Sequence, residues 1–299
     1  MFTDVKRWFM WGRTEQNGAS QYKWVIEPVG EGFVARVKEF WRYRRILWFL
    51  SVQQIKGSYQ GYSLGIGWLF LRPLLPILIS TFIFGNLLNV PSDGLPYFLF
   101  FLAGQASWHV FERSLLMVTR SLYQGQGMLK KVYFPRIMAP ISSMAISVVW
   151  FGTFTGLLIL AAFYYLFKDG VWYLRLGPQL LIAPLCVVAS LVLSLGIGLF
   201  TSVLQLRFRE MRYTLRYFTR FWSYLTPVIY PMSLVPPEHR WLIYLNPMAP
   251  LVETFKWSLF GVGSFPVIPL LSALGVIAVI LLAGIWYFSR MEASAVDRM

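Results

Sequence analysis

The chain has 299 residues, of which 57% are hydrophobic and 13% charged, and its formal net charge at pH 7 is +14. Soluble domains carry charge on about a quarter of their residues, so this composition disfavours a soluble protein and favours an integral membrane protein. The single cysteine, Cys186, excludes an internal disulfide, and the two distant histidines, His109 and His239, indicate no metal site.

Residues 1–62 form a basic, polar arm that lacks the apolar core of a signal peptide. Within this arm, residues 33–50 (FVARVKEFWRYRRILWFL) place apolar and aromatic side chains near helical spacing among cations. Such a pattern suits a helix that lies on the anionic cytoplasmic leaflet. We therefore predict an N-terminal amphipathic interface helix; a helix that packs on a soluble partner is the alternative.

Six segments are apolar over the roughly 20 residues that a bilayer-crossing helix needs. They are residues 64–88, 96–118, 141–167, 179–206, 215–235 and 265–289. Arg72 and two prolines predict a kink in the first segment, while Pro227 and Pro231 interrupt the fifth. We predict an all-α integral membrane protein with a six-helix transmembrane domain over residues 63–290 and a tail over 291–299.

Lysine and arginine predict the orientation of these spans. Of the 27 Lys and Arg residues, 21 fall on one side of the six spans and four on the other. By the positive-inside rule, both termini are cytoplasmic. The same asymmetry explains much of the net charge, so nucleic-acid binding is the weaker interpretation of this basic chain.

Charged residues inside spans are candidates for function by default. Glu112 and Arg113 lie about two turns from the cytoplasmic end of the second span, and adjacent helix positions diverge by about 100°. They are therefore not expected to pair with each other. His109 lies one turn away and can face either residue. We favour a structural polar contact over a proton relay.

The cytoplasmic loop 119–140 contains the sequence GQGMLKKVYFPRI (125–137). A loop that only reverses the chain would be short and rich in Gly, Asn or Ser. Apolar residues beside cations instead indicate a docking surface or an anchor at lipid headgroups, and the residues alone leave both open. The candidate contact residues are Gln126, Met128, Leu129, Lys130, Lys131, Tyr133, Phe134, Pro135 and Arg136.

Residues 207–220, which join the fourth span to the first turns of the fifth, hold five arginines and one acid. This density suits the pyrophosphate headgroup of a lipid carrier, although positive-inside topology explains the same residues and is the favoured interpretation. The headgroup candidates are Arg207, Arg209 and Arg212.

Prolines divide residues 227–264 into short apolar pieces, including RWLIYL (240–245) and LVETFKWSLFG (251–261). These pieces are too short to span and too apolar for a water-exposed loop. We predict short re-entrant helices before the last span, forming a periplasmic gate segment; an interfacial hairpin that caps the bundle is the alternative. Glu253 and Lys256 have the spacing of an i,i+3 ion pair, with a gate latch as the less favoured role.

Six sequence stretches together resemble the permease subunit of bacterial ABC exporters of the polysaccharide and polyol-phosphate type, which export lipid-linked O-antigen, capsule and teichoic-acid chains. The stretches are VIEP (25–28) with WRYRRILWFL (41–50), LGIGWLFLRPLL (64–75), LKKVYFPR (129–136), RFREMRY (207–213), TPVIYPMSLVP (226–236) and LNPMAPLVETFKWSLFG (245–261). The resemblance covers about residues 25–290.

The chain departs from this family pattern at several positions. Ser58, Tyr59 and Gln60 stand where the family usually has a basic Arg-Tyr-Lys cluster. Arg72 stands at a position that tends to be Gln, and His109 at one that tends to be Asn. Gly125 and Gly127 replace residues that are often Glu or Asn.

The resemblance implies a transport subunit and not an enzyme. No phosphate-binding G-x-x-x-x-G-K-[ST] motif occurs in the sequence, so ATP and Mg²⁺ should bind to a separate ATPase subunit. Residues 124–136 would form a coupling helix that docks on that ATPase. Six spans make half a pathway, so we expect a homodimer with two ATPase copies in the bacterial cytoplasmic (inner) membrane. No cofactor and no nucleic acid are expected for this chain.

A polysaccharide path favours aromatic rings with sparse polar groups, because sugars present C–H faces and hydroxyls. The chain has 25 Phe, 16 Tyr and 13 Trp, most of which are expected to be packing or interface residues. The candidates for the substrate path and gate are Trp222, Tyr224, Pro227, Tyr230, Pro231, Trp241, Tyr244 and Glu253.

Two other functions remain as alternatives. The first is export of a smaller amphiphile, such as a lipid or drug. The second is a membrane-embedded glycan-processing enzyme, which would need a carboxylate pair or a metal cluster. The outer acids Asp93, Asp169, Glu238 and Glu253 are scattered along the sequence, which disfavours the enzyme.

Overall fold

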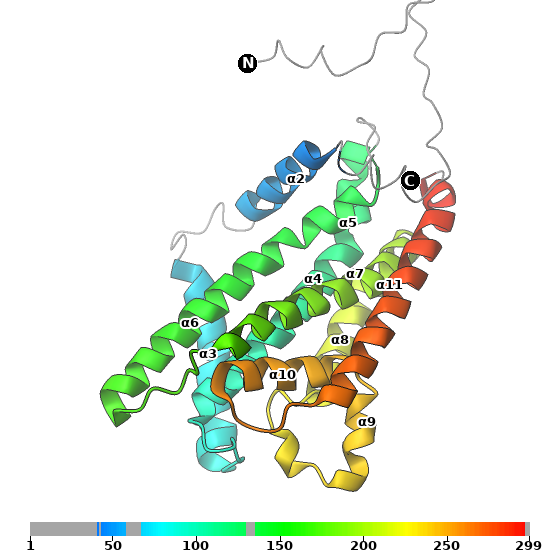
Figure 1. The fold of residues 1–299 in the computed structure, drawn as a ribbon. Helices are drawn as coiled ribbons and strands as arrows, with labels where there is room; N and C mark the ends of the chain where they lie inside the picture. The colour runs from blue at the N-terminus through cyan, green and yellow to red at the C-terminus, as the bar shows by residue number, and fades with distance from the viewer. Residues whose placement is uncertain (1–40, 42, 58–66, 130–134, 297–299) are drawn as a thin grey trace, which may run out of the picture. The chain divides into compact units, whose positions relative to one another are not determined.

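The computed structural model describes residues 41, 43–57, 67–129 and 135–296 (Figure 1). Within these residues every regular element is helical, which confirms the all-α prediction. The elements are α2 (Arg44–Gly57), α3 (Gly67–Ser80), η2 (Thr81–Leu87), α4 (Tyr97–Leu129), α5 (Met138–Ser143), α6 (Ala145–Asp169), η3 (Pro178–Leu181), α7 (Ile182–Arg207), α8 (Met211–Tyr224), η4 (Met232–Leu234), η5 (Pro237–His239), α9 (Arg240–Tyr244), α10 (Met248–Phe260) and α11 (Val267–Val296).

Four of the expected spans are present as helical segments long and apolar enough to cross a membrane. These segments are Gly67–Leu87, Met138–Asp169, Pro178–Arg207 and Val267–Met291. The second expected span lies within α4, whose 33 residues are long enough to cross. Four charged residues interrupt the apolar sequence of α4: Glu112, Arg113, Arg120 and, when protonated, His109. The structure therefore shows a multi-pass membrane protein.

The expected fifth span, residues 215–235, is interrupted at the prolines that predicted a break, and its crossing of the membrane stays a prediction. The helix there, α8, has only 14 residues and ends at Tyr224. At 1.5 Å per residue it is about 21 Å long, shorter than a hydrocarbon core of roughly 30 Å. Pro227 and Pro231 follow in a buried turn, where neither can supply the backbone N–H that a helix would need.

The core is built around α4 and α7, which pack against each other along their lengths. Small residues allow close approach: a Cβ at Gly198 on α7 would overlap the Val118 side chain on α4, and one at Gly284 on α11 would overlap the Gly196 carbonyl. The hydroxyls of Thr119 and Thr201 lie 2.7 Å apart across the α4–α7 contact. Small residues and hydroxyl pairs of this kind hold helices together in lipid, where apolar burial gives little drive.

Helix α3 stands at the edge of this core. Among its 14 residues only Ile77 is buried. Pro73 and Pro76 lie within the helix. Most of its apolar side chains, including Leu71, Leu75 and Leu78, are exposed. This helix therefore presents an apolar face to lipid or to another chain.

The N-terminal interface helix can be compared only in its C-terminal part, because residues 33–40 and 42 lie outside the described residues. The described helix α2 continues to Gly57, seven residues beyond the expected end. It packs against α5 and α6 while Trp48 and Phe49 are exposed. An exposed aromatic pair on a helix packed beside the bundle agrees with the amphipathic pattern.

The predicted coupling loop lies partly outside the described residues, which exclude Lys130, Lys131, Tyr133 and Phe134. Helix α4 extends to Leu129, so Gln126, Met128 and Leu129 belong to its last turns. Pro135 and Arg136 are half-buried where the chain enters α5. Docking by this loop stays a prediction.

Candidate functional site

The segment after α8 folds into short helices at both of the apolar pieces expected from the sequence. Helix α9 covers Arg240–Tyr244, and α10 covers Met248–Phe260. Nearly all of α10 is buried, and it packs against α4 and α7. Gly261, with a positive φ of 70°, ends α10, a conformation that glycine adopts without strain. Two short helices are thus confirmed, while their re-entrant insertion stays a prediction.

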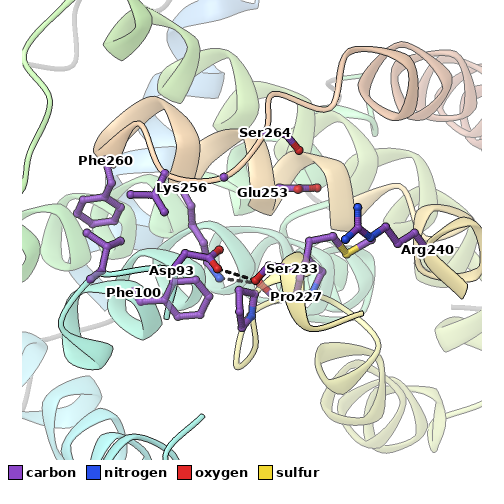
Figure 2. A pocket seen from close by; sticks show the side chains of 14 residues that line it. Asp93, Phe100, Pro227, Ser233, Arg240, Glu253, Lys256, Phe260 and Ser264 are labelled. Carbon is purple, nitrogen blue, oxygen red and sulfur yellow. Dashed lines mark hydrogen bonds between the residues drawn. The ribbon is translucent and has the colours of Figure 1, made fainter. Parts of the chain in front are cut away.

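A buried lysine fastens α10 to the turn that follows α8 (Figure 2). The Lys256 ammonium donates hydrogen bonds to the carbonyls of Pro227 at 2.7 Å and Val228 at 3.4 Å, and lies 3.4 Å from the centroid of the Phe100 ring on α4. Only 7% of Lys256 is exposed. The carbonyls and the ring replace water around the buried charge. We call Lys256, Pro227, Val228 and Phe100 the lysine junction.

The expected i,i+3 ion pair between Glu253 and Lys256 is wrong: within the described residues these side chains do not form a salt bridge. Glu253 instead accepts a hydrogen bond of 2.9 Å from the Tyr244 hydroxyl on α9. The i,i+3 spacing allows an ion pair, but the Lys256 ammonium instead donates hydrogen bonds to the Pro227 and Val228 carbonyls. Glu253 thereby ties α9 to α10.

Helix α4 holds the same turn at two further points. A Cβ at Gly104 would lie 2.8 Å from the Val228 carbonyl oxygen and 3.0 Å from Cε of Lys256, so a glycine is needed for this approach. About two helical turns before Gly104, the Tyr97 hydroxyl donates a 2.7 Å hydrogen bond to the Ile229 carbonyl. The turn is therefore held at consecutive carbonyls by α4 and α10 together.

Asn246 links the end of α8 to the start of α10. Its side-chain amide donates to the Thr226 hydroxyl at 2.7 Å, and its side-chain oxygen accepts from the backbone N–H of Met248 at 3.0 Å. The second bond satisfies one of the free N–H groups at the start of α10. Residues 226–248 are thus closed into one loop.

A cavity of about 460 Å³ opens beside the lysine junction (Figure 2). Its charged lining residues are Asp93, Arg240, Glu253 and Lys256, and Ser233 donates a 2.5 Å hydrogen bond to Asp93. Phe100, Phe260 and Met232 supply apolar walls. Carboxylates and hydroxyls beside aromatic rings can bind a hydroxyl-rich ligand through hydrogen bonds and C–H contact.

Burial shifts the pKa values of the Glu253 carboxyl, which lines this cavity, and of its hydrogen-bond partner, the Tyr244 hydroxyl. Burial raises the pKa of the Glu253 carboxyl, although the Tyr244 hydrogen bond and the Lys256 charge act in the opposite direction. Burial, together with the Glu253 charge, also raises the pKa of the Tyr244 hydroxyl. Tyr244 is therefore a hydrogen-bond donor at neutral pH.

The predicted path residues divide into two groups. Pro227, Pro231 and Glu253 line the cavity, and Tyr244 reaches it through Glu253. Trp222 does not line it, because its ring packs 5.1 Å from that of Phe111 and 6.2 Å from that of Trp108 on α4. The remaining three, of which Tyr224 and Trp241 are largely exposed and Tyr230 is half-buried, are not among its lining residues.

The three headgroup candidates gather at the α7–α8 turn. Arg212 stacks 4.5 Å over the Tyr213 ring and donates a 2.7 Å hydrogen bond to its hydroxyl. Arg207 lies 5.5 Å over the Phe208 ring, and Arg209 is exposed. Lipid binding by this turn stays a prediction.

Within α4, His109 faces Glu112, which is one of the two residues that it was expected to face. His109 Nδ1 lies 3.9 Å from one Glu112 oxygen, and the other oxygen accepts a 3.1 Å hydrogen bond from Thr219 on α8. Glu112 therefore joins α4 to α8, which agrees with a structural polar contact.

The sequence pointed to Lys256 and Pro227 of the lysine junction but not to Phe100 and Val228. Neither these two nor Gly104 beside them carries a distinctive pattern in the sequence. Lys256 itself carried a signal, because a lysine in a buried apolar helix requires a nearby acceptor or ring. Its partners could not be named, since they lie on a turn 28 to 29 residues away and on another helix.

Comparison with known proteins supplies the context for this geometry. A model of the family described as ABC-2 type transporter matches residues 45–260. The chain is 26% identical over 263 residues to the O-antigen export system permease protein RfbA of Myxococcus xanthus, covering 87% of this chain and 97% of that protein. A protein of the same name from Klebsiella pneumoniae is 25% identical, with 83% and 92% covered. The inner membrane transport permease YadH of Escherichia coli strain K12 is 23% identical, with 71% and 82% covered.

Proposed function

The chain belongs to the ABC-2 type transporter family, and from that membership we propose that it is the transmembrane permease subunit of an exporter that moves a lipid-linked polysaccharide, O-antigen or a related glycan, across the cytoplasmic membrane. The observation that carries this proposal is the likeness to O-antigen export permeases over most of both chains. The proposal fits the cavity at the lysine junction, whose hydroxyl-binding groups suit a glycan.

The proposed topology has six crossings with both termini in the cytoplasm. Helix α4 provides the second crossing, which is supported by the contacts of Glu112 with Thr219 on α8 and of Arg113 with Trp150 on α6. Helix α8 and the turn held by the lysine junction together provide the fifth. Helices α9 and α10 then form the periplasmic gate segment, with α10 entering from the outer surface as a re-entrant helix.

The motor in this proposal is a separate ATPase subunit that binds ATP and Mg²⁺. Residues 124–136 dock on it, with Met128, Leu129, Tyr133 and Phe134 as buried contacts. Lys130, Lys131 and Arg136 steer and hold the complex through their charge. Two copies of this chain with two ATPase copies complete the pathway.

Docking is tested by charge reversal. The double variant Lys130→Glu/Lys131→Glu should reduce co-purification of the ATPase by about tenfold or more, because each contact changes from attraction to repulsion. Arg290→Glu, on the exposed C-terminal part of α11, is the control and should leave the complex intact. An undiminished complex in the double variant would assign the loop to lipid headgroups instead.

The cargo is tested in cells. Deletion of the gene should remove surface glycan while lipid-linked polymer accumulates inside, and expression of the intact chain should restore the surface polymer. The E. coli relative is named only as a transport permease, so export of a smaller amphiphile is the second candidate. Normal surface glycan in the deletion strain would favour that candidate over polysaccharide export.

A further inference from the structure

A second cavity, of about 240 Å³, lies between α3, α4 and α6, away from the lysine junction. Its walls include Pro73 and Pro76 of α3 and Phe154 of α6. Six of its lining residues carry polar groups: Arg72, Ser80, Gln105, His109, Arg113 and Trp150. We call this set the arginine pocket.

The polar residues lie on matching faces of two helices. On α4, Gln105, His109 and Arg113 recur at four-residue spacing, and on α3 Arg72 and Ser80 are eight residues apart. Positions four and eight apart share one helix face. Two polar stripes therefore flank the cavity, in helices that are otherwise apolar. Polar stripes inside a membrane mark a water-filled or ligand-binding space.

Two guanidinium groups converge on one ring in this pocket. Arg72 and Arg113 lie 6.0 Å and 5.5 Å from the centroid of the Trp150 ring on α6. Among the described residues that line the cavity, none is acidic. A phosphate in this cavity would therefore lie near both guanidinium groups and would be attracted by both positive charges.

Trp150 adds an independent observation. It is 6% exposed, and its indole N–H has no hydrogen-bond partner among the described residues. A buried N–H without an acceptor costs about 1–3 kcal/mol, so such a group is a candidate for contact with a ligand oxygen. The described lining of the pocket thus carries several N–H donors and no carboxylate. Phosphate oxygens are the acceptors that suit such a set of donors.

We propose that the arginine pocket binds the phosphate group of a lipid headgroup, with Arg72, Arg113 and the Trp150 N–H as its donors. The apolar tail lies along the exposed face of α3 that carries Leu71, Leu75 and Leu78. The headgroup belongs either to a pyrophosphate-linked carrier or to an ordinary bilayer phospholipid. Only the assignment to a carrier rests on the proposed export function.

Binding is tested with the full-length purified chain in detergent, by titration of three probes under native mass spectrometry. The probes are undecaprenyl pyrophosphate, phosphatidylglycerol and a diacylglycerol that lacks phosphate. We expect the first two to bind and the third not to bind. Tighter binding of the pyrophosphate identifies a carrier site, whereas equal binding of both phospho-lipids identifies a bilayer phospholipid as the occupant. Binding of diacylglycerol with equal affinity overturns the proposal.

Variants locate the bound phosphate. Arg72→Gln and Arg113→Gln should each weaken phospho-lipid binding about tenfold or more, because each removes a charge-assisted hydrogen bond. Trp150→Phe keeps the ring and removes the N–H, and should weaken binding by a few-fold. Arg290→Gln is the matched control, because Arg290 also stacks on a tryptophan, 4.7 Å from the Trp286 ring, outside the pocket. Equal affinities in all four variants overturn the proposal, whether or not the chain exports polysaccharide.

Discussion

The lysine junction and the arginine pocket solve the same physical problem in opposite ways. Each places cationic side chains against an aromatic ring, but Lys256 is buried, whereas Arg113 is half-buried and Arg72 is exposed. At the junction, two backbone carbonyls complete the surroundings of a single ammonium. In the pocket, two guanidiniums share one ring and face a cavity. We therefore expect the buried Lys256 to act as a fastener and the two arginines at the cavity to bind a ligand.

Removal of the junction cation should produce the largest effect on stability. Lys256→Met keeps most of the side-chain volume but leaves the Pro227 and Val228 carbonyls buried without a donor. We expect a loss of about 2–4 kcal/mol in the free energy of unfolding, measured as a lower thermal midpoint of the purified chain in detergent. Lys168→Met, at the exposed end of α6, should change stability by less than about 0.5 kcal/mol. Equal midpoints for Lys256→Met and the wild type would show that the junction does not fasten α10.

The close approach of α4 to the proline turn gives the next effect. Gly104→Ala should destabilise the chain by about 1–3 kcal/mol, because its Cβ would push Val228 and Lys256 apart. Gly152→Ala on α6 is the control, since a Cβ there meets no atom within 4 Å. That control should be neutral or stabilising by about 0.5–1 kcal/mol. A neutral Gly104→Ala would mean that the turn can move away from α4 freely.

The contact between α9 and α10 is weaker. Tyr244→Phe removes one hydrogen bond of 2.9 Å to Glu253 and should cost about 0.5–1.5 kcal/mol. The same thermal measurement detects it. Tyr224→Phe, at an exposed tyrosine outside the cavity, serves as the comparison. A loss of stability as large as that of Lys256→Met would mean that the Tyr244–Glu253 hydrogen bond holds α9 and α10 in place as strongly as the lysine junction does.

Loss of a pocket arginine should have little effect on the lipid-free chain. Arg72 is exposed, so Arg72→Gln should change the stability of the lipid-free chain by less than about 0.5 kcal/mol. When phospho-lipid is added, the wild type should gain more stability than the variant, because only the wild type retains both arginines for the anion. A destabilised lipid-free variant would make Arg72 a structural residue and would erase the contrast with the lysine junction.

Apolar length predicted the long helices well, because it is a property of consecutive residues. The first, third, fourth and sixth expected spans agree with the apolar helical segments of the structure within a few residues. Residues 215–235 are not one continuous helix, because Pro227 and Pro231 lie in a buried turn after α8. The two prolines, more than the hydropathy of the segment, determined its structure.

The sites were less predictable because they join distant parts of the chain. Arg72 and Trp150 are 78 positions apart, and Gly104 meets Val228 at a separation of 124 positions. No local spacing rule links such pairs. A local spacing rule did apply to Glu253 and Lys256, but the ion pair that it predicted is absent. The Lys256 ammonium instead donates to the backbone carbonyls of the proline turn. Glu253, Pro227 and Pro231 were nevertheless predicted correctly as lining residues of the cavity beside the lysine junction. They lie where prolines break the apolar sequence, and irregular backbone in a membrane protein occurs where it lines a cavity or is buried in protein.

The most direct test of polysaccharide export is transport in proteoliposomes that contain this chain with its ATPase. Lipid-linked O-antigen added on the ATPase-facing side should become accessible to a glycan-specific lectin in the opposite compartment only when ATP and Mg²⁺ are supplied. A carrier lipid without its glycan should be moved much more slowly. ATP-driven movement of the bare carrier at the same rate, or no movement of the glycan at all, would contradict the assignment of this chain as a polysaccharide permease.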